Sequence, residues 1–136
     1  MKLKKTIPAL PVQDMEMATA FYAGKLGFTV GHQEDDFAIL VRDEVEIHLW
    51  KSGDETWRDR GVGIVSLPIC SGAESFLAGT VSCRIEVQGI DQLYQECKAK
   101  GILHSPNTVV KDQPWGDREF AAVDLYRNLI TFYEMG

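Results

Sequence analysis

The sequence lacks the features of disulfide-rich, zinc-binding and membrane-spanning proteins. Only three of its 136 residues are cysteines, and Cys70, Cys83 and Cys97 contain no pair separated by two residues. An odd, scattered set of this kind fits neither a disulfide framework nor a zinc site, so we expect reduced thiols. No apolar run is long enough to cross a bilayer. The basic residues 1–5 precede an apolar segment too short and too broken by proline for a signal peptide, which favours a cytoplasmic protein.

Basic residues are also in the minority. The chain has 14 Lys and Arg against 20 Asp and Glu, a formal net charge of −6. This excess of negative charge argues against nucleic acid and anionic membrane surfaces as partners. It is compatible with a cationic small ligand, although acidity alone is common among cytoplasmic proteins. The hydrophobic content of 45% is ordinary for a folded globular protein, so we expect an ordered chain.

The predicted elements occur in the same order in both halves of the chain. In the first half, a strand is expected over 3–10, a helix after Asp14, and strands over 28–33, 37–42 and 45–50. In the second half, a strand is expected over 81–87, a helix over 92–100, and strands over 109–112, 119–124 and 129–134. A doubled unit can bury one shared face. We therefore expect a single α+β domain over 1–136, with one module over about 1–51, a long connection over 52–79, and a second module over about 80–136.

Local patterns predict which side chains share a face. Asp14 is a good N-cap for the first helix, and Gly27 is expected to end it. The expected buried face of this helix consists of Met17, Ala18, Phe21 and Tyr22. The alternating segment 45–50 places Glu46, His48 and Trp50 on one strand face. Trp57 lies in the irregular connection, where it is expected to pack at the edge of a cleft.

Two stretches, one in each half, combine an aromatic residue with acids or a tight turn. In the segment 113–120, Pro114 and Gly116 predict a turn that holds Trp115 in a fixed place. In the first half, three acids at 34–36 precede Phe37 at the start of a strand. Each stretch alone is better explained as a surface plug or a solvated turn. Together they indicate a slot for a flat, cationic ligand.

The doubled unit, the Phe-Tyr…Lys-Leu-Gly-Phe pattern at 21–28 and the closing strand at 129–134 resemble the glyoxalase/bleomycin resistance/dioxygenase superfamily over nearly the whole chain. The segments 34–43 and 113–121 resemble its bleomycin-resistance branch. This resemblance implies paired βαβββ modules that form two curled mixed sheets around a cleft. It also implies a homodimer that exchanges the first strand, with two clefts at the interface.

Enzymes of this superfamily hold one divalent metal on the first, fourth, fifth and last strands. The resemblance places those positions at Ile7, His48, Ser82 and Thr131. Only His48 is a plausible ligand, so the resemblance implies no cofactor and no metal, unless one is present at His48. No catalytic residue is predicted. A shifted alignment leaves open a metal-dependent lyase, isomerase or dioxygenase-like enzyme.

The resemblance also implies a ligand site without catalysis. The flat bithiazole of a bleomycin-type antibiotic is expected between Phe37 and Trp115, which would sequester the drug. The other expected ligand-binding residues are His32, Asp36, His48, Trp50 and Gly116. His32 stands where the best-known members have another aromatic residue, and the connection over 52–79 is longer than theirs. A binding protein for another aromatic metabolite therefore stays open.

Overall fold

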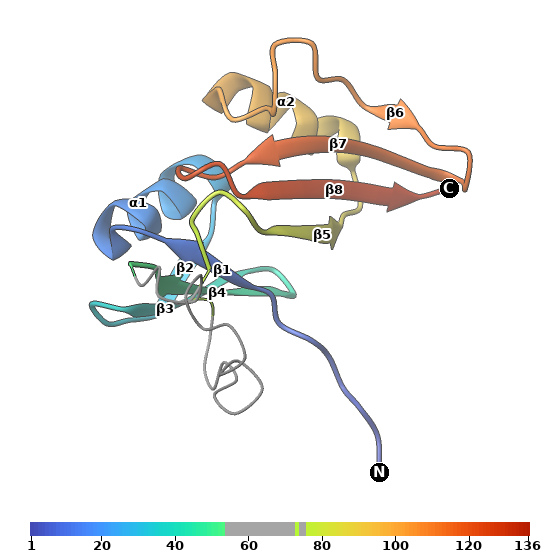
Figure 1. The fold of residues 1–136 in the computed structure, drawn as a ribbon. Coiled ribbons are helices and arrows are strands. Elements are labelled where there is room, and N and C mark those ends of the chain that lie inside the picture. The colour runs from blue at the N-terminus through green and yellow to red at the C-terminus, as the bar shows by residue number, and fades with distance from the viewer. Residues whose placement is uncertain (54–72, 74–75) are drawn as a thin grey trace, which may run out of the picture.

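The computed structural model describes residues 1–53, 73 and 76–136, and its elements follow the order βαβββ twice (Figure 1). The first half contains β1 (Ala9–Val12), α1 (Met15–Leu26), β2 (Thr29–Gln33), β3 (Phe37–Arg42) and β4 (Val45–Lys51). The second half contains β5 (Ser82–Glu86), α2 (Ile90–Lys100), β6 (Lys111–Asp112), β7 (Asp117–Val123) and β8 (Leu129–Met135). The predicted α+β fold with a repeated βαβββ unit is confirmed.

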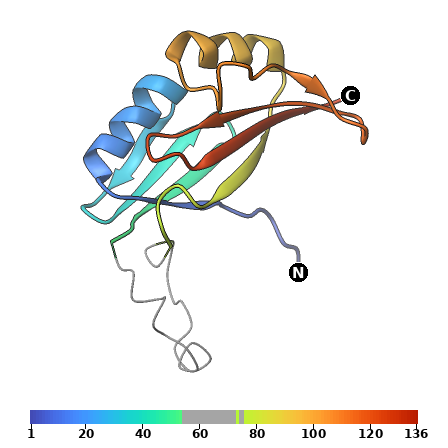
Figure 2. The ribbon, with the colours of Figure 1, turned by 45° about the horizontal axis from the view of Figure 1, so that its top comes forward.

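Each half forms its own four-stranded mixed sheet. The strand orders are β1-β4-β3-β2 and β5-β8-β7-β6. In each sheet the first strand of the half runs parallel to the last, and the other pairs are antiparallel. Neither sheet closes into a barrel. One helix packs against one face of each sheet, and we call the opposite face of each sheet its open face (Figures 1 and 2). Neither helix in the described part of the chain has the length and apolar character needed to cross a membrane.

The helix α1 begins and ends where the sequence predicts. The Asp14 carboxylate accepts a hydrogen bond from the Met17 backbone N–H at 2.8 Å, and Gly27 ends the helix with a φ of 71°. The predicted buried face is wrong at Met17, whose exposed fraction is 57%. The buried stripe is instead spaced three or four residues apart along Met15, Ala18, Tyr22 and Leu26. Met17 lies to one side of this stripe.

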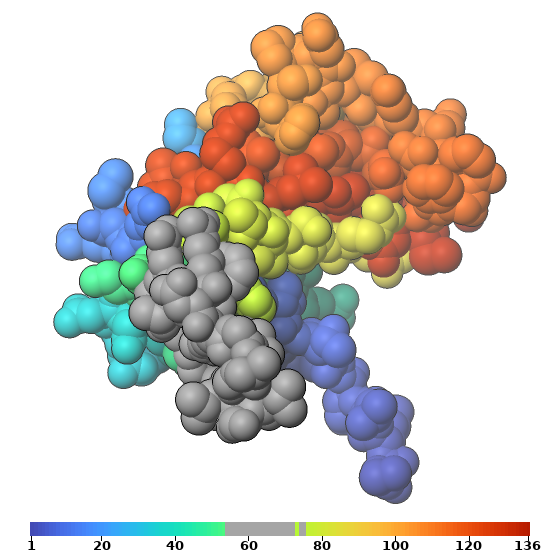
Figure 3. Space-filling view, viewed as in Figure 1, coloured from blue at the N-terminus to red at the C-terminus, as the bar shows by residue number. Residues whose placement is uncertain are grey.

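The predicted first strand over 3–10 is also wrong. The strand β1 covers only Ala9–Val12, and residues 1–8 leave the body as an arm (Figures 1 and 3). Pro8 accepts a hydrogen bond from the His48 N–H through its carbonyl, but it has no N–H of its own. The parallel ladder with β4 therefore ends at Pro8. Leu3, which was expected to begin this strand, is 95% exposed.

A buried polar cluster joins the two halves. The Tyr22 hydroxyl on α1 donates to Asp124 Oδ2 at 2.9 Å, just after β7. Asn128 Nδ2 donates to the same Asp124 oxygen at 3.0 Å and to the Pro11 carbonyl of β1 at 2.8 Å. The other Asp124 oxygen accepts the backbone N–H groups of Tyr126 and Asn128. Burial, followed by the charge of Asp124, raises the pKa of Tyr22 well above its usual value, so this phenol remains a donor at neutral pH.

The two described cysteines belong to the protein interior. Cys97 is 1% exposed on α2, and Cys83 is half-buried on β5. Burial raises the pKa of each thiol to about 11. Both are therefore neutral thiols at neutral pH, as expected of small, reduced core residues.

Removing the Tyr22 hydroxyl tests the cluster. Tyr22→Phe leaves the buried Asp124 carboxylate one donor short, and we expect it to lower the free energy of unfolding by about 2 kcal/mol. Urea titration followed by circular dichroism measures this change. Tyr94→Phe is the matched control, because the Tyr94 hydroxyl donates to a neutral carbonyl, that of Thr108. If Tyr22→Phe lowers the free energy of unfolding no more than Tyr94→Phe does, the cluster does not stabilise the contact between the two halves as proposed.

Candidate functional site

The open face of the first sheet carries a group of rings. In β3 and β4 the side chains of Ala38, Leu40, Ile47 and Leu49 are buried, so their neighbours point to the opposite face. Phe37 and Trp50 are cross-strand partners with ring centroids 4.6 Å apart. The His48 ring lies edge-on to Phe37 at 5.1 Å, and the His32 ring of β2 lies 6.2 Å from it. Four of the residues expected from the sequence thus share one half-exposed surface.

Carboxylates orient both histidines of this face. Glu46 Oε2 lies 2.7 Å from His48 Nε2, and Glu34 Oε2 lies 2.9 Å from His32 Nε2. The hydrogen bond from His48, followed by that from Lys5 at 3.1 Å, holds the pKa of the Glu46 carboxyl below its usual range. Lys5 comes from the N-terminal arm, so the arm already contacts this face.

The predicted turn around Trp115 is present on the second sheet. The Gly116 N–H donates to the Gln113 carbonyl at 3.0 Å, and Gly116 has a φ of +104°, which favours glycine. The Trp115 side chain is 65% exposed, and its Nε1 donates to Asp117 Oδ2 at 3.0 Å. The indole is therefore anchored by its edge, while most of its surface faces solvent.

A single chain does not bring Phe37 and Trp115 together. The β2–β3 turn, which precedes Phe37, and the β6–β7 turn, which carries Trp115, lie at opposite ends of the molecule (Figures 1 and 2). Asp36 and Gly116 belong to these same two turns. The residues expected from the sequence therefore form two separate groups, one on each sheet.

Charged residues beside Trp115 were missed at the sequence level. Arg84 Nη2 lies 3.2 Å from Asp117 Oδ2 and 3.0 Å from Glu119 Oε2, on the open face of the second sheet. Its guanidinium also lies 4.7 Å from the centroid of the Tyr133 ring. Carboxylates beside an aromatic ring attract organic cations, and here an internal arginine occupies them. The signal in the sequence was the alternation along β7, which places the carboxylates of Asp117 and Glu119 on the same strand face.

Of the four positions that the resemblance assigned to metal ligands, only His48 carries a side chain typical of a metal ligand. Among residues 1–53, 73 and 76–136, no three His, Cys, Asp or Glu side chains form a group that could hold a metal ion. Ile7 lies in the N-terminal arm, Ser82 begins β5, and Thr131 of β8 pairs with Arg84. Trp57, expected at the edge of a cleft, lies outside the described residues.

The chain belongs to the Glyoxalase/Bleomycin resistance protein/Dioxygenase superfamily, whose family model matches residues 6–132. Proteins called "Bleomycin resistance protein" from Geobacillus stearothermophilus and Staphylococcus aureus are each 56% identical to it over 130 residues, which is 96% of both chains.

Solved structures share the fold over the whole chain. A bleomycin-binding protein from bleomycin-producing Streptomyces verticillus, complexed with copper(II)-bleomycin, is 25% identical with a TM-score of 0.73, covering 100% of this chain and 98% of that one. A bleomycin resistance determinant encoded on the transposon Tn5 has a TM-score of 0.72 over 98% of each chain, at 20% identity. At 20% identity the likeness shows the fold alone.

The exposure of Trp115 leads to a stability prediction. Trp115→Ala removes a mostly solvated ring and one exposed hydrogen bond, so we expect the free energy of unfolding to change by about 0.5 kcal/mol or less. Phe37→Ala removes packing against Trp50 and His48 and should cost more. Urea unfolding of both variants measures the difference. A loss of several kcal/mol in Trp115→Ala would mean that the indole is part of the core.

Proposed function

We propose that this protein binds and sequesters a bleomycin-type antibiotic without changing it chemically. The observation that carries the proposal is the half-exposed ring group of Phe37, Trp50 and His48 on an open sheet face. Relatives that are 56% identical are called bleomycin resistance proteins, and a protein of the same fold has been solved with copper(II)-bleomycin bound. A flat, cationic drug suits a face of this kind.

The binding energy comes from stacking on aromatic rings. By analogy with bases on aromatic side chains, each stacked ring contributes about 1–3 kcal/mol. We assign the two principal rings to Phe37 and Trp115, with His32, Asp36, His48, Trp50 and Gly116 around them. The acids of the β2–β3 turn and the pair Asp117 and Glu119 then attract the cationic part of the ligand and speed its approach.

The proposal excludes a reaction. Cys83 and Cys97 have pKa values of about 11, so neither supplies a thiolate nucleophile at neutral pH. After prolonged incubation with the protein, bleomycin released by denaturation should have an unchanged mass. A modified drug in the mass spectrum would instead indicate an enzyme.

The composition leads us to place this sequestration in the cytoplasm.

We propose that the binding unit is a homodimer. Because Phe37 and Trp115 lie at opposite ends of one chain, a flat ligand can contact both rings only if they come from different copies. Each cleft then combines the first sheet of one copy with the second sheet of the other. The arm formed by residues 1–8 extends from the body, and we propose that it exchanges with the partner (Figure 3).

Truncating the two rings tests the proposed site. We expect Trp115→Ala and Phe37→Ala each to weaken bleomycin binding by about 2 kcal/mol, which is ~30-fold in affinity. The double variant should deviate from additivity, because both rings contact one flat ligand. Calorimetric titration of bleomycin into the wild type and the three variants measures these changes. Wild-type affinity in the single variants would place the site elsewhere.

Mixed dimers test whether the two rings come from different copies. Chains carrying Phe37→Ala and chains carrying Trp115→Ala are co-expressed with different tags, and the mixed dimer is purified. One of its two clefts then contains both intact rings, so we expect half of the wild-type stoichiometry with wild-type affinity. Two equally weakened sites would show that both rings of a site come from one chain. A 15.2 kDa species in light scattering at micromolar concentration would contradict the dimer itself.

A further inference from the structure

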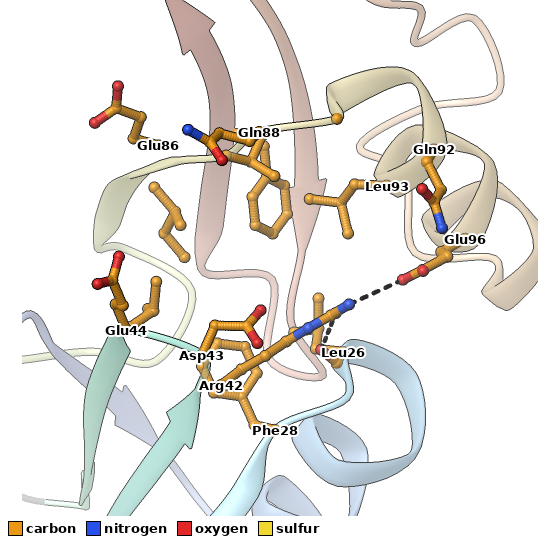
Figure 4. A pocket seen from close by; sticks show the side chains of 15 residues that line it. Leu26, Phe28, Arg42, Asp43, Glu44, Glu86, Gln88, Gln92, Leu93 and Glu96 are labelled. Carbon is orange, nitrogen blue, oxygen red and sulfur yellow. Dashed lines mark hydrogen bonds and ion pairs between the residues drawn. The ribbon is translucent and has the colours of Figure 1, made fainter.

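A cavity of about 550 Å³ lies between the two halves of the chain (Figure 4). Residues 42–45, in and beside the β3–β4 turn, form one wall, and residues 85–89, from the end of β5 to the start of α2, form another. The first turns of α2 supply Gln92, Leu93 and Glu96. None of the residues assigned above to antibiotic binding lines this cavity, so it is a separate site.

The inner surface of this cavity is apolar. It is formed by Leu26, Phe28, Val45, Ile85, Leu93 and Phe132. Most of these side chains belong to the hydrophobic core, and the core is accessible from the cavity at this place between the two halves. A volume of 550 Å³ lies within the range of about 300–1,000 Å³ that is typical of small-molecule pockets. The cavity can therefore hold the apolar body of a small organic molecule.

The polar side of the cavity is acidic. Its carboxylates are Asp43, Glu44, Glu86 and Glu96, and Arg42 is the cationic side chain among its lining residues. Arg42 Nη1 donates to the Leu26 carbonyl at 2.7 Å, and its Nη2 lies 3.2 Å from Glu96 Oε2. Figure 4 shows the guanidinium directed toward Leu26 and Glu96. Arg42 is thus ion-paired with one of the four acids, Glu96.

Three carboxylates remain for a ligand. Within the described residues, Asp43, Glu44 and Glu86 form no ion pair, and the Arg42 guanidinium is held in place against the backbone of Gly27. A cation entering the cavity gains attraction from three negative charges and loses little hydration, because the rim is open to solvent. An anion of the same size is repelled. The charge pattern therefore selects the sign of the ligand.

We propose that this cavity is a second binding site, for a small organic cation with an apolar body. The apolar body lies on Leu93, Phe132 and Phe28, and the cationic group lies among Glu44, Glu86 and Asp43. Both halves of the chain supply walls, so an occupant links the β3–β4 turn to the start of α2. This site requires neither a second copy of the chain nor the aromatic face.

The test uses benzyltrimethylammonium, whose charge does not depend on pH, and 3-phenylpropionate, which has a similar ring with the opposite charge. Titration at low ionic strength is followed by 1H–15N NMR. We expect benzyltrimethylammonium to shift the amide signals of Val45, Gly89 and Leu93, and 3-phenylpropionate to leave them unchanged. Signals of Phe37, Trp50 and Trp115 should not respond.

Variants distinguish the contribution of the carboxylates to binding from that of the apolar inner surface. Glu44→Gln combined with Glu86→Gln should weaken benzyltrimethylammonium binding about fivefold, since each exposed charge contributes modestly. Val45→Phe should weaken binding by narrowing the apolar part of the cavity. Glu16→Gln, which removes one negative charge from the exposed side of α1, should have no effect. Thermal melts verify that each variant is folded.

Three results would overturn the proposal: signals that shift only at the aromatic face, equal binding of 3-phenylpropionate, or unchanged affinity in the folded Val45→Phe variant. Because bleomycin binding is measured separately through Phe37 and Trp115, failure here leaves the antibiotic proposal standing, and the reverse also holds.

Discussion

The buried contact between Tyr22, Asp124 and Asn128 determines how the two halves of this protein sit against each other. It joins α1 and β1 of the first half to the β7–β8 turn of the second. A buried carboxylate is tolerated only where donors surround it, so the cluster allows one geometry of the two halves. The hydrophobic core supplies most of the burial, but it does not by itself specify this one arrangement.

Both candidate sites follow from this arrangement. The halves are joined at the β7–β8 turn, and they diverge toward the far end of β5 and β8, where the acidic cavity opens. Their open faces carry the rings of Phe37 and Trp50 on one sheet and Trp115 on the other. The internal contact thus positions the acidic cavity between the halves and keeps the two groups of rings on separate sheets.

Several elements were predictable because their causes are local. Asp14 and Gly27 bound α1 through a cap and a left-handed residue, and Gly116 shapes the turn that holds Trp115. The first strand was not predictable, because a strand exists only where a partner supplies hydrogen bonds, and Pro8 ends that pairing. The exposure of Met17 likewise depends on which stripe of α1 meets the sheet, and not on its hydrophobicity.

The sequence by itself determined the doubled βαβββ unit, the family, and the residue types available to a ligand, since periodicity, caps and turn residues act over a few positions. Only the tertiary structure decided which of those residues meet. It grouped Phe37 with His32, His48 and Trp50, placed Trp115 beside Arg84 and Asp117, and set the acids of the β3–β4 turn against α2. The physical reason is that such contacts join residues far apart in the chain, and strand register and the packing of the two halves specify them.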